Sequence, residues 1–122
     1  MELLDCEIMQ VSKEQLFEMQ AELCGLMANP KRLMILDYLS QEGEANVGQI
    51  AEALELSMPV VSQHLRLMRD GNVVVSRKSG HCVCYRLKHP GLMTGCHAVR
   101  DVLHEELKAR GQMAEFIAGQ NE

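Results

Sequence analysis

Apolar residues recur at every third or fourth position over most of the chain, which is the spacing of one face of an amphipathic helix. This pattern predicts five helices, over residues 12–28, 30–42, 47–54, 57–69 and 91–110. Ser12 followed by Gln15 resembles a capping box, and Pro30 suits the first position of the second helix. Gly71 suits the left-handed position that follows the fourth helix.

The periodicity then changes from 3.6 to 2, which indicates strands in place of helices. One strand begins at 73–75, a turn follows at 78–81, and on the returning strand Val83, Tyr85 and Leu87 alternate with Cys82, Cys84 and Arg86. The predicted order is ααααββα, mainly α with a β-hairpin. A short helix, a tight link, a second helix and a basic hairpin predict a winged helix-turn-helix, with 47–69 as the helix-turn-helix and 73–88 as the wing.

Length and composition favour an ordinary globular protein. The chain has 122 residues, of which 47% are apolar and 24% charged, so we expect a single domain over 1–122. No apolar run approaches the roughly 18 residues of a membrane span, and the start lacks a secretory signal. We therefore expect a cytoplasmic protein that does not bind membranes, with a flexible tail over 1–11 and a short helical tail over 112–118.

Charge is sorted along the chain, although the formal total is −5. Residues 1–56 hold three Lys or Arg and eleven Asp or Glu, whereas 57–90 hold six basic residues and one acidic residue, Asp70. Residues 91–122 are again slightly acidic. A basic block between acidic flanks is either a solvated surface or a local contact for phosphate.

The basic block carries side chains that hydrogen-bond base edges and phosphates in a DNA groove. The helix over 57–69 and the hairpin that follows it supply the candidate DNA-binding residues, which are Ser57, Ser62, Gln63, His64, Arg66, Arg77, Lys78 and His81. Together with the order of elements, they predict double-stranded DNA as the partner.

Three stretches of the chain resemble the ArsR/SmtB family of repressors. Residues 26–36 (LMANPKRLMIL) are similar to the second helix of the family, 60–71 (VVSQHLRLMRDG) to its recognition helix, and 80–87 to its wing. The resemblance covers about residues 14–107 and implies a homodimeric winged-helix repressor whose first and last helices form the dimer interface. It also implies that an inducer, commonly a metal ion, a metalloid or a reactive sulfur species, releases operator DNA.

The inducer sites best known in the family have no counterpart in this chain. Where metalloid sensors carry paired cysteines, the chain has 44–48 (EANVG), without a thiol. The four positions of the zinc site correspond to His89, Gly91, Val102 and Glu105, of which two are not ligands. Asp37 stands where persulfide sensors carry a cysteine.

The chain offers other candidates for sensing a signal. Five cysteines, an odd number, argue for metal or redox roles and against a secreted disulfide scaffold. The thiol candidates are Cys24 and Cys96, which would approach each other if the first and last helices pack together, and Cys82 and Cys84, on one side of a strand. A possible zinc or thiophilic-metal site consists of His97, Asp101 and His104, which share one face of the last helix. Cys6 lies in the predicted tail. No resident cofactor is predicted.

Two other classes of protein compete with a repressor. A thiol enzyme is disfavoured because the short chain has no glycine-rich loop and no C-x-x-C motif, so we predict no enzymatic activity. The alternative is a winged-helix scaffold that buffers metal or binds proteins without specific DNA binding. The expected function is a homodimeric repressor that releases DNA on sensing a thiol-reactive signal or a metal or metalloid ion.

Overall fold

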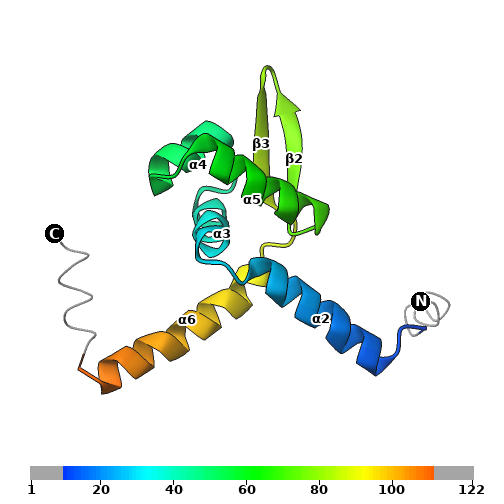
Figure 1. Ribbon diagram of the computed structural model, residues 1–122, viewed down its shortest axis with the longest axis vertical. Coiled ribbons are helices and arrows are strands. Elements are labelled where there is room, and N and C mark those ends of the chain that lie inside the picture. The colour runs from blue at the N-terminus through cyan, green and yellow to red at the C-terminus, as the bar shows by residue number, and fades with distance from the viewer. Residues whose placement is uncertain (1–9, 112–122) are drawn as a thin grey trace. The chain divides into compact units, whose positions relative to one another are not determined.

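The computed structural model describes residues 10–111, and the chain forms two compact units that divide between Lys88 and His89. The predicted helical tail, Cys6 and most of the predicted N-terminal tail lie outside the described residues. The first unit contains α2 (Lys13–Met27), α3 (Pro30–Glu42), β1 (Ala45–Asn46), α4 (Val47–Leu54), α5 (Met58–Asp70), β2 (Val74–Ser79) and β3 (Cys82–Leu87) (Figure 1). The second unit contains α6 (Leu92–Ala109).

Side-chain caps set the start of α2, α3 and α4, and the capping box of α2 is the one among them that the sequence predicted. The Ser12 hydroxyl accepts a hydrogen bond from the Gln15 amide at 3.1 Å, and the Gln15 side chain accepts one from the Ser12 amide at 2.8 Å. Asn29 caps α3, whose first residue is Pro30. A second capping box, formed by Asn46 and Gln49, begins α4. These caps satisfy amide groups that have no partner within the helix.

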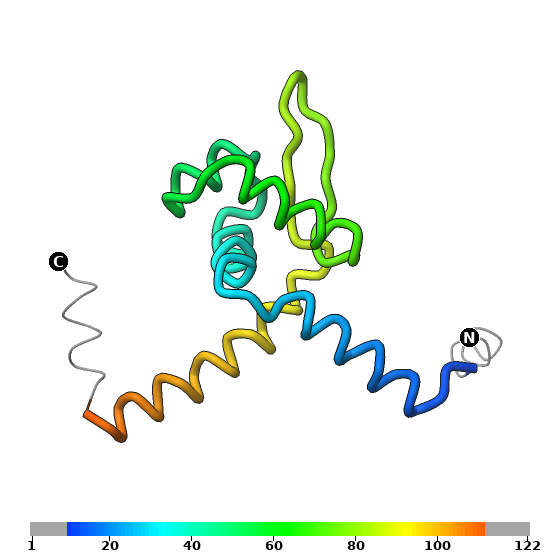
Figure 2. Tube along the Cα trace, viewed as in Figure 1, coloured from blue at the N-terminus to red at the C-terminus, as the bar shows by residue number. Residues whose placement is uncertain are grey.

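The three strands form one antiparallel sheet in the order β1-β3-β2. Ser79 pairs with Cys82 across a two-residue turn, in which Gly80 has a φ of +64°. Figure 2 shows β2 and β3 as two neighbouring segments joined by a tight turn. Glycine at the first central position is typical of a type II′ hairpin turn. The predicted order of helices and hairpin strands is confirmed, and β1 is an addition that the sequence pattern did not reveal. Ala45 pairs with Tyr85, and Asn46 with Cys84.

The core of the first unit lies between α3, α4, α5 and one face of the sheet. The side chains of Ile35, Leu36, Ile50, Val61, Leu65 and Met68 have no exposed surface. Tyr85 and Leu87 of β3 are buried, whereas Cys82 and Arg86 are exposed, so the predicted alternation on this strand holds except at Val83 near the tip. No described helix is long and apolar enough to cross a membrane.

The end of α5 differs from the sequence prediction. Asn72, not Gly71, adopts the left-handed conformation, with a φ of 62°. The Asn72 amide donates to the Arg69 carbonyl and the Val73 amide donates to the Met68 carbonyl, which is the pattern of a Schellman cap. Position 71 favours glycine for a different reason, because a Cβ there would lie 2.1 Å from Cδ2 of Leu26 on α2, and the end of that side chain would have to shift.

Candidate nucleic-acid interface

One face of α5 is polar and exposed, and the opposite face is buried. Gln63 and Arg66 are exposed and lie one turn apart on the side opposite Val61, Leu65 and Met68. Ser62 is half-buried beside them. Because the apolar face is held in the core, the polar face points away from the unit.

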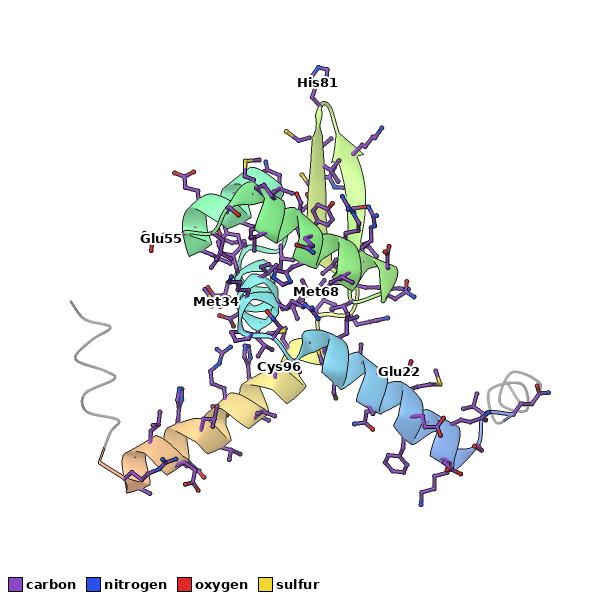
Figure 3. All side chains as sticks on the ribbon, in the orientation of Figure 1. Glu22, Met34, Glu55, Met68, His81 and Cys96 are labelled. Carbon is purple, nitrogen blue, oxygen red and sulfur yellow. The ribbon has the colours of Figure 1, made fainter. Side chains whose placement is uncertain are left out.

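The turn between α4 and α5 fixes the start of this helix. Glu55 adopts the left-handed conformation, with a φ of 55°, and the Leu56 amide donates to the Ala51 carbonyl at 3.0 Å. Figure 3 shows Glu55 at this turn. Ser57 is exposed and caps α5, since its hydroxyl accepts a hydrogen bond from the Val60 amide at 3.3 Å. The predicted helix-turn-helix over 47–69 therefore corresponds to α4, a three-residue turn and α5.

The hairpin of β2 and β3 extends beyond α4 and α5, and His81 lies at its tip (Figures 1 and 3). Lys78 is exposed on β2, two residues before Gly80. The hairpin thus presents two candidate DNA-binding side chains next to a glycine turn.

Arg77, the third candidate on the wing, is bound to Glu44. Its Nε donates to Oε2 of Glu44 at 2.7 Å and its Nη2 to Oε1 at 2.5 Å. This two-pronged hydrogen bond holds the pKa of the Glu44 carboxyl below its ordinary value and raises that of Arg77. Since the pKa of Glu44 is lowered, any stability that the pair contributes is present above the ordinary pKa of a glutamate and is lost as the pH falls through the lowered value. The pair joins β2 to the segment that precedes β1.

His64 lies on the side of α5 that faces α3. Its Nδ1 accepts a hydrogen bond from Nε of Arg32 at 3.2 Å, and the ring is half-buried. Nη1 of Arg32 also donates to the carbonyl oxygen of Leu26 at 2.8 Å. Partial burial, with the positive charges of Arg32 and Lys31, lowers the pKa of His64 below 6.5. His64 therefore differs from Gln63 and Arg66, because it is engaged inside the protein.

The four cysteines in the described residues are free thiols. Cys84 is half-buried on β3 and pairs in register with Arg77 of β2 and Asn46 of β1, so the three side chains share one face of the sheet. Cys82 is exposed on the same face, nearer the tip. Cys24 is exposed on α2, and Cys96 is half-buried on α6.

The three proposed metal ligands lie along one helix, α6. His97 and Asp101 are exposed and His104 is half-buried. Within residues 10–111, no three His, Cys, Asp or Glu side chains are grouped closely enough to hold a metal ion.

Sequence reasoning missed two residues of this region, Arg32 and Glu44. Arg32 lies 32 positions before His64, and Glu44 lies 33 positions before Arg77. The one sequence feature that could have drawn attention to Arg32 is its place in the stretch 26–36, which resembles the family. No sequence feature pointed to Glu44, because nothing in its own segment indicates a partner on the wing.

The fold and this interface define a winged helix-turn-helix protein with a polar recognition face and a cationic wing. Residues 29–76 match the model of a family described as "Bacterial regulatory protein, arsR family". The chain is 35% identical over 92 residues to nodulation protein NolR of Rhizobium meliloti, and the match covers 75% of each protein. The chain belongs to the arsR family of bacterial regulatory proteins.

Two further similarities agree with this assignment. The arsenical resistance operon repressor of Escherichia coli K12 is 38% identical over 71 residues, which are 58% of this chain and 61% of that protein. The solution structure of the homodimeric winged helix-turn-helix DNA-binding domain of Mb0332 from Mycobacterium bovis is similar with a TM-score of 0.69 and 31% identity. That similarity covers 80% of this chain and 89% of the other. The predicted family and fold are confirmed, and these relatives are named as regulators rather than enzymes.

Proposed function

We propose that this protein is a homodimeric transcriptional repressor that binds operator DNA through α5 and the β2–β3 wing. The observation that carries the proposal is the exposed face of Gln63 and Arg66, which α5 directs away from the core beside a wing that bears Lys78 and His81. A helix with such a face fits the major groove, where Gln and Arg read base edges, and the wing cations suit phosphate. Ser57 and Ser62 supply hydroxyls near the start of the same helix.

Dimerisation is supported by the apolar side chains of α2 and α6. On α2, Leu16, Phe17 and Met19 are each more than half exposed, and on α6 the same is true of Val99, Val102 and Leu103. An apolar helix face of this kind is stabilised when it is buried against another apolar surface. A second copy of the chain supplies one, and two recognition helices then meet successive turns of DNA.

For the signal, we propose a thiol-reactive compound that acts on the wing. Cys82 and Cys84 lie on the face of the sheet that holds Arg77, opposite the face of Lys78, so a charged or bulky group on either sulfur changes the charge and the shape of the wing that carries Lys78 and His81. Residues two apart on a strand stand roughly 6–7 Å from each other, which is too far for an easy disulfide between them. Each thiol is therefore expected to react separately.

The DNA-binding proposal is tested with a labelled duplex from the region upstream of the gene, using reduced, metal-free protein in fluorescence anisotropy. We expect tighter binding to this duplex than to a shuffled duplex of equal composition, and an affinity that falls steeply with salt. Equal and weak binding to both duplexes contradicts specific operator binding. It favours the alternative, a scaffold that binds proteins or metal.

The signal is tested by adding an inorganic polysulfide to the complex, followed by dithiothreitol. We expect release of DNA that dithiothreitol reverses, and no release from the Cys82→Ser/Cys84→Ser double variant. The matched control is Cys24→Ser/Cys96→Ser, which should respond as the wild type does. If the control is the variant that loses the response, the sensing thiols lie on α2 and α6. If polysulfide does not release DNA from the reduced wild-type protein but a metal ion does, the signal is a metal.

A further inference from the structure

Three helices of the first unit meet at the side chain of Arg32. One guanidinium nitrogen donates to the last turn of α2, at the Leu26 carbonyl, and another donates to His64 of α5. The backbone of Arg32 is itself fixed, because its amide donates to Oδ1 of Asn29 at 3.2 Å in the cap of α3. We call this contact of Leu26, Arg32 and His64 the arginine clasp.

The clasp requires one protonation state of His64. Since Nδ1 accepts the hydrogen bond from Arg32, the ring must be neutral, with its proton on Nε2. The charged groups that act on the ring, Arg32 and Lys31, both come from α3 and are both positive. From α2 the clasp receives only the Leu26 carbonyl, as an acceptor for Arg32. A second positive charge on the ring is therefore disfavoured.

The clasp also bears on the direction of the recognition face. Val61, Leu65 and Met68 hold the buried face of α5 in the core, and the hydrogen bond from Arg32 to His64 adds a directional contact on the side of the helix that faces α3. His64 is adjacent in sequence to Gln63, so loss of this contact changes how firmly Gln63 is oriented.

We propose that Arg32 and His64 are positioning residues, which orient the recognition face of α5 toward DNA by tying this helix to α2 and α3, and that His64 is not itself a DNA contact. The inference rests on the proposed DNA-binding function. It also connects the recognition helix to α2, the helix whose apolar face is proposed to bind a second copy of the chain.

The two possible roles of His64 predict pH effects of opposite sign. A histidine that contacts phosphate gains affinity when acid protonates it, because its charge becomes positive. A histidine in the clasp loses its acceptor on protonation, since both ring nitrogens then carry protons, and it repels Arg32. The clasp therefore predicts weaker DNA binding as the pH falls through the pKa of His64.

The clasp is tested first in the free protein, by NMR of the histidine ring nitrogens. We expect His64 in the Nε2–H form, titrating below 6.5, and a partial return of its pKa toward 6.5 in Arg32→Met, which removes the positive charge and the hydrogen bond while the ring stays partly buried. Titration of His64 at its ordinary pKa in the wild type overturns the inference, and it leaves the DNA-binding proposal intact.

The positioning role is tested by measuring DNA affinity between pH 7.5 and 5.5 at constant ionic strength. We expect the wild type to lose about threefold to tenfold, the range of one lost hydrogen bond. His64→Asn, whose Oδ1 accepts at any pH near the position of Nδ1, should stay within about twofold across this range. His81→Asn, which removes the imidazole at the tip of the wing, is the matched control and should retain the wild-type fall.

The positioning role of Arg32 and His64 also predicts the behaviour of an Arg32 variant. Arg32→Lys should bind DNA more weakly than the wild type at pH 7.5 while its circular dichroism and thermal midpoint show a folded protein. A rise in wild-type affinity on acidification that disappears in His64→Asn overturns the positioning role and makes His64 a phosphate contact. If NMR shows the clasp but the folded wild type binds no duplex at any pH, the DNA-binding proposal fails and the positioning role fails with it.

Discussion

Helices α2 and α5 are of similar length but differ in how much of their apolar surface one chain can bury. In α5, Val61, Leu65 and Met68 are completely buried, and the residues left exposed include Gln63 and Arg66. In α2, Met27 is the one buried residue, while Leu16, Phe17 and Met19 are 59%, 60% and 57% exposed.

The difference indicates that the two helices meet different partners. The apolar face of α5 is satisfied inside the first unit, so the helix is fixed and its polar face remains available for a polar ligand. The apolar face of α2 remains exposed, which favours a second apolar surface as its partner.

Removing buried volume from α5 should have the largest effect. Leu65→Ala should lower the free energy of unfolding by about 2–5 kcal/mol, because Leu65 has no exposed surface and the cavity cannot fill with water. Chemical denaturation measures the change. The control is Leu67→Ala on the same helix, where the side chain is 43% exposed and the loss should be much smaller. Equal losses at the two positions contradict the assigned faces of α5.

A charge on the apolar face of α2 should break the dimer without unfolding the chain. Met19→Lys should raise the dissociation constant of the dimer about 100-fold, since the ammonium group loses water on association. Sedimentation velocity over a range of concentrations measures it, and DNA affinity should fall in parallel. Glu18→Lys is the control, because it places the same side chain at the neighbouring position. Dissociation by Glu18→Lys alone places the interface on the polar face instead.

Adding a methyl group at Gly71, where the end of α5 lies close to α2, should lower the free energy of unfolding by an intermediate amount. In Gly71→Ala the new Cβ conflicts with Leu26, which must move, at a cost of about 1–2 kcal/mol in unfolding free energy. A double-mutant cycle with Leu26→Ala measures the coupling, and the second substitution should relieve part of the cost. Strict additivity of the two changes argues that α2 and α5 are not in tight contact here.

Releasing Arg77 from Glu44 should have the smallest effect. Glu44→Gln removes a carboxylate from the neighbourhood of the wing and frees a guanidinium, so DNA affinity should rise about twofold to fivefold and the salt dependence should steepen by about one phosphate contact. Because the pKa of Glu44 is lowered, the wild-type carboxylate is charged at neutral pH. Glu42→Gln carries the same change in net charge and is the control. A fall in affinity in Glu44→Gln shows that the pair instead holds the wing in place.

The sequence predicted those parts of the fold that depend on neighbouring residues. Ser12 with Gln15 and Asn29 with Pro30 set helix ends through contacts within three residues, which a reader of the sequence can recognise. The alternation around Tyr85 and Leu87 revealed β3 because one face of it is buried. By contrast, β1 has two residues, which is too short for any periodicity. Gly71 was assigned the wrong role because its constraint comes from Leu26 on another helix.

The candidate interface was predictable as a set of residue types but not as a set of contacts. Gln63 and Arg66 are exposed on α5, where the helical period places them. His64 and Arg77 belong to the same basic block, yet each is engaged by a residue more than 30 positions away. Such pairs form only when the helices and the sheet pack, so local sequence cannot distinguish a side chain aimed at solvent from one held by the protein.

If the exposed face of α5 reads operator DNA, variants of that face should bind the upstream duplex and a shuffled duplex with less difference in affinity than the wild type does. Gln63→Ala and Arg66→Ala, measured by fluorescence anisotropy at fixed salt, should each weaken binding to the upstream duplex by about 1–3 kcal/mol while changing binding to the shuffled duplex less. Glu52→Ala on α4 is the control and should not show this loss of discrimination. Full discrimination between the two duplexes in the Gln63→Ala/Arg66→Ala double variant would contradict readout of the operator by this face of α5.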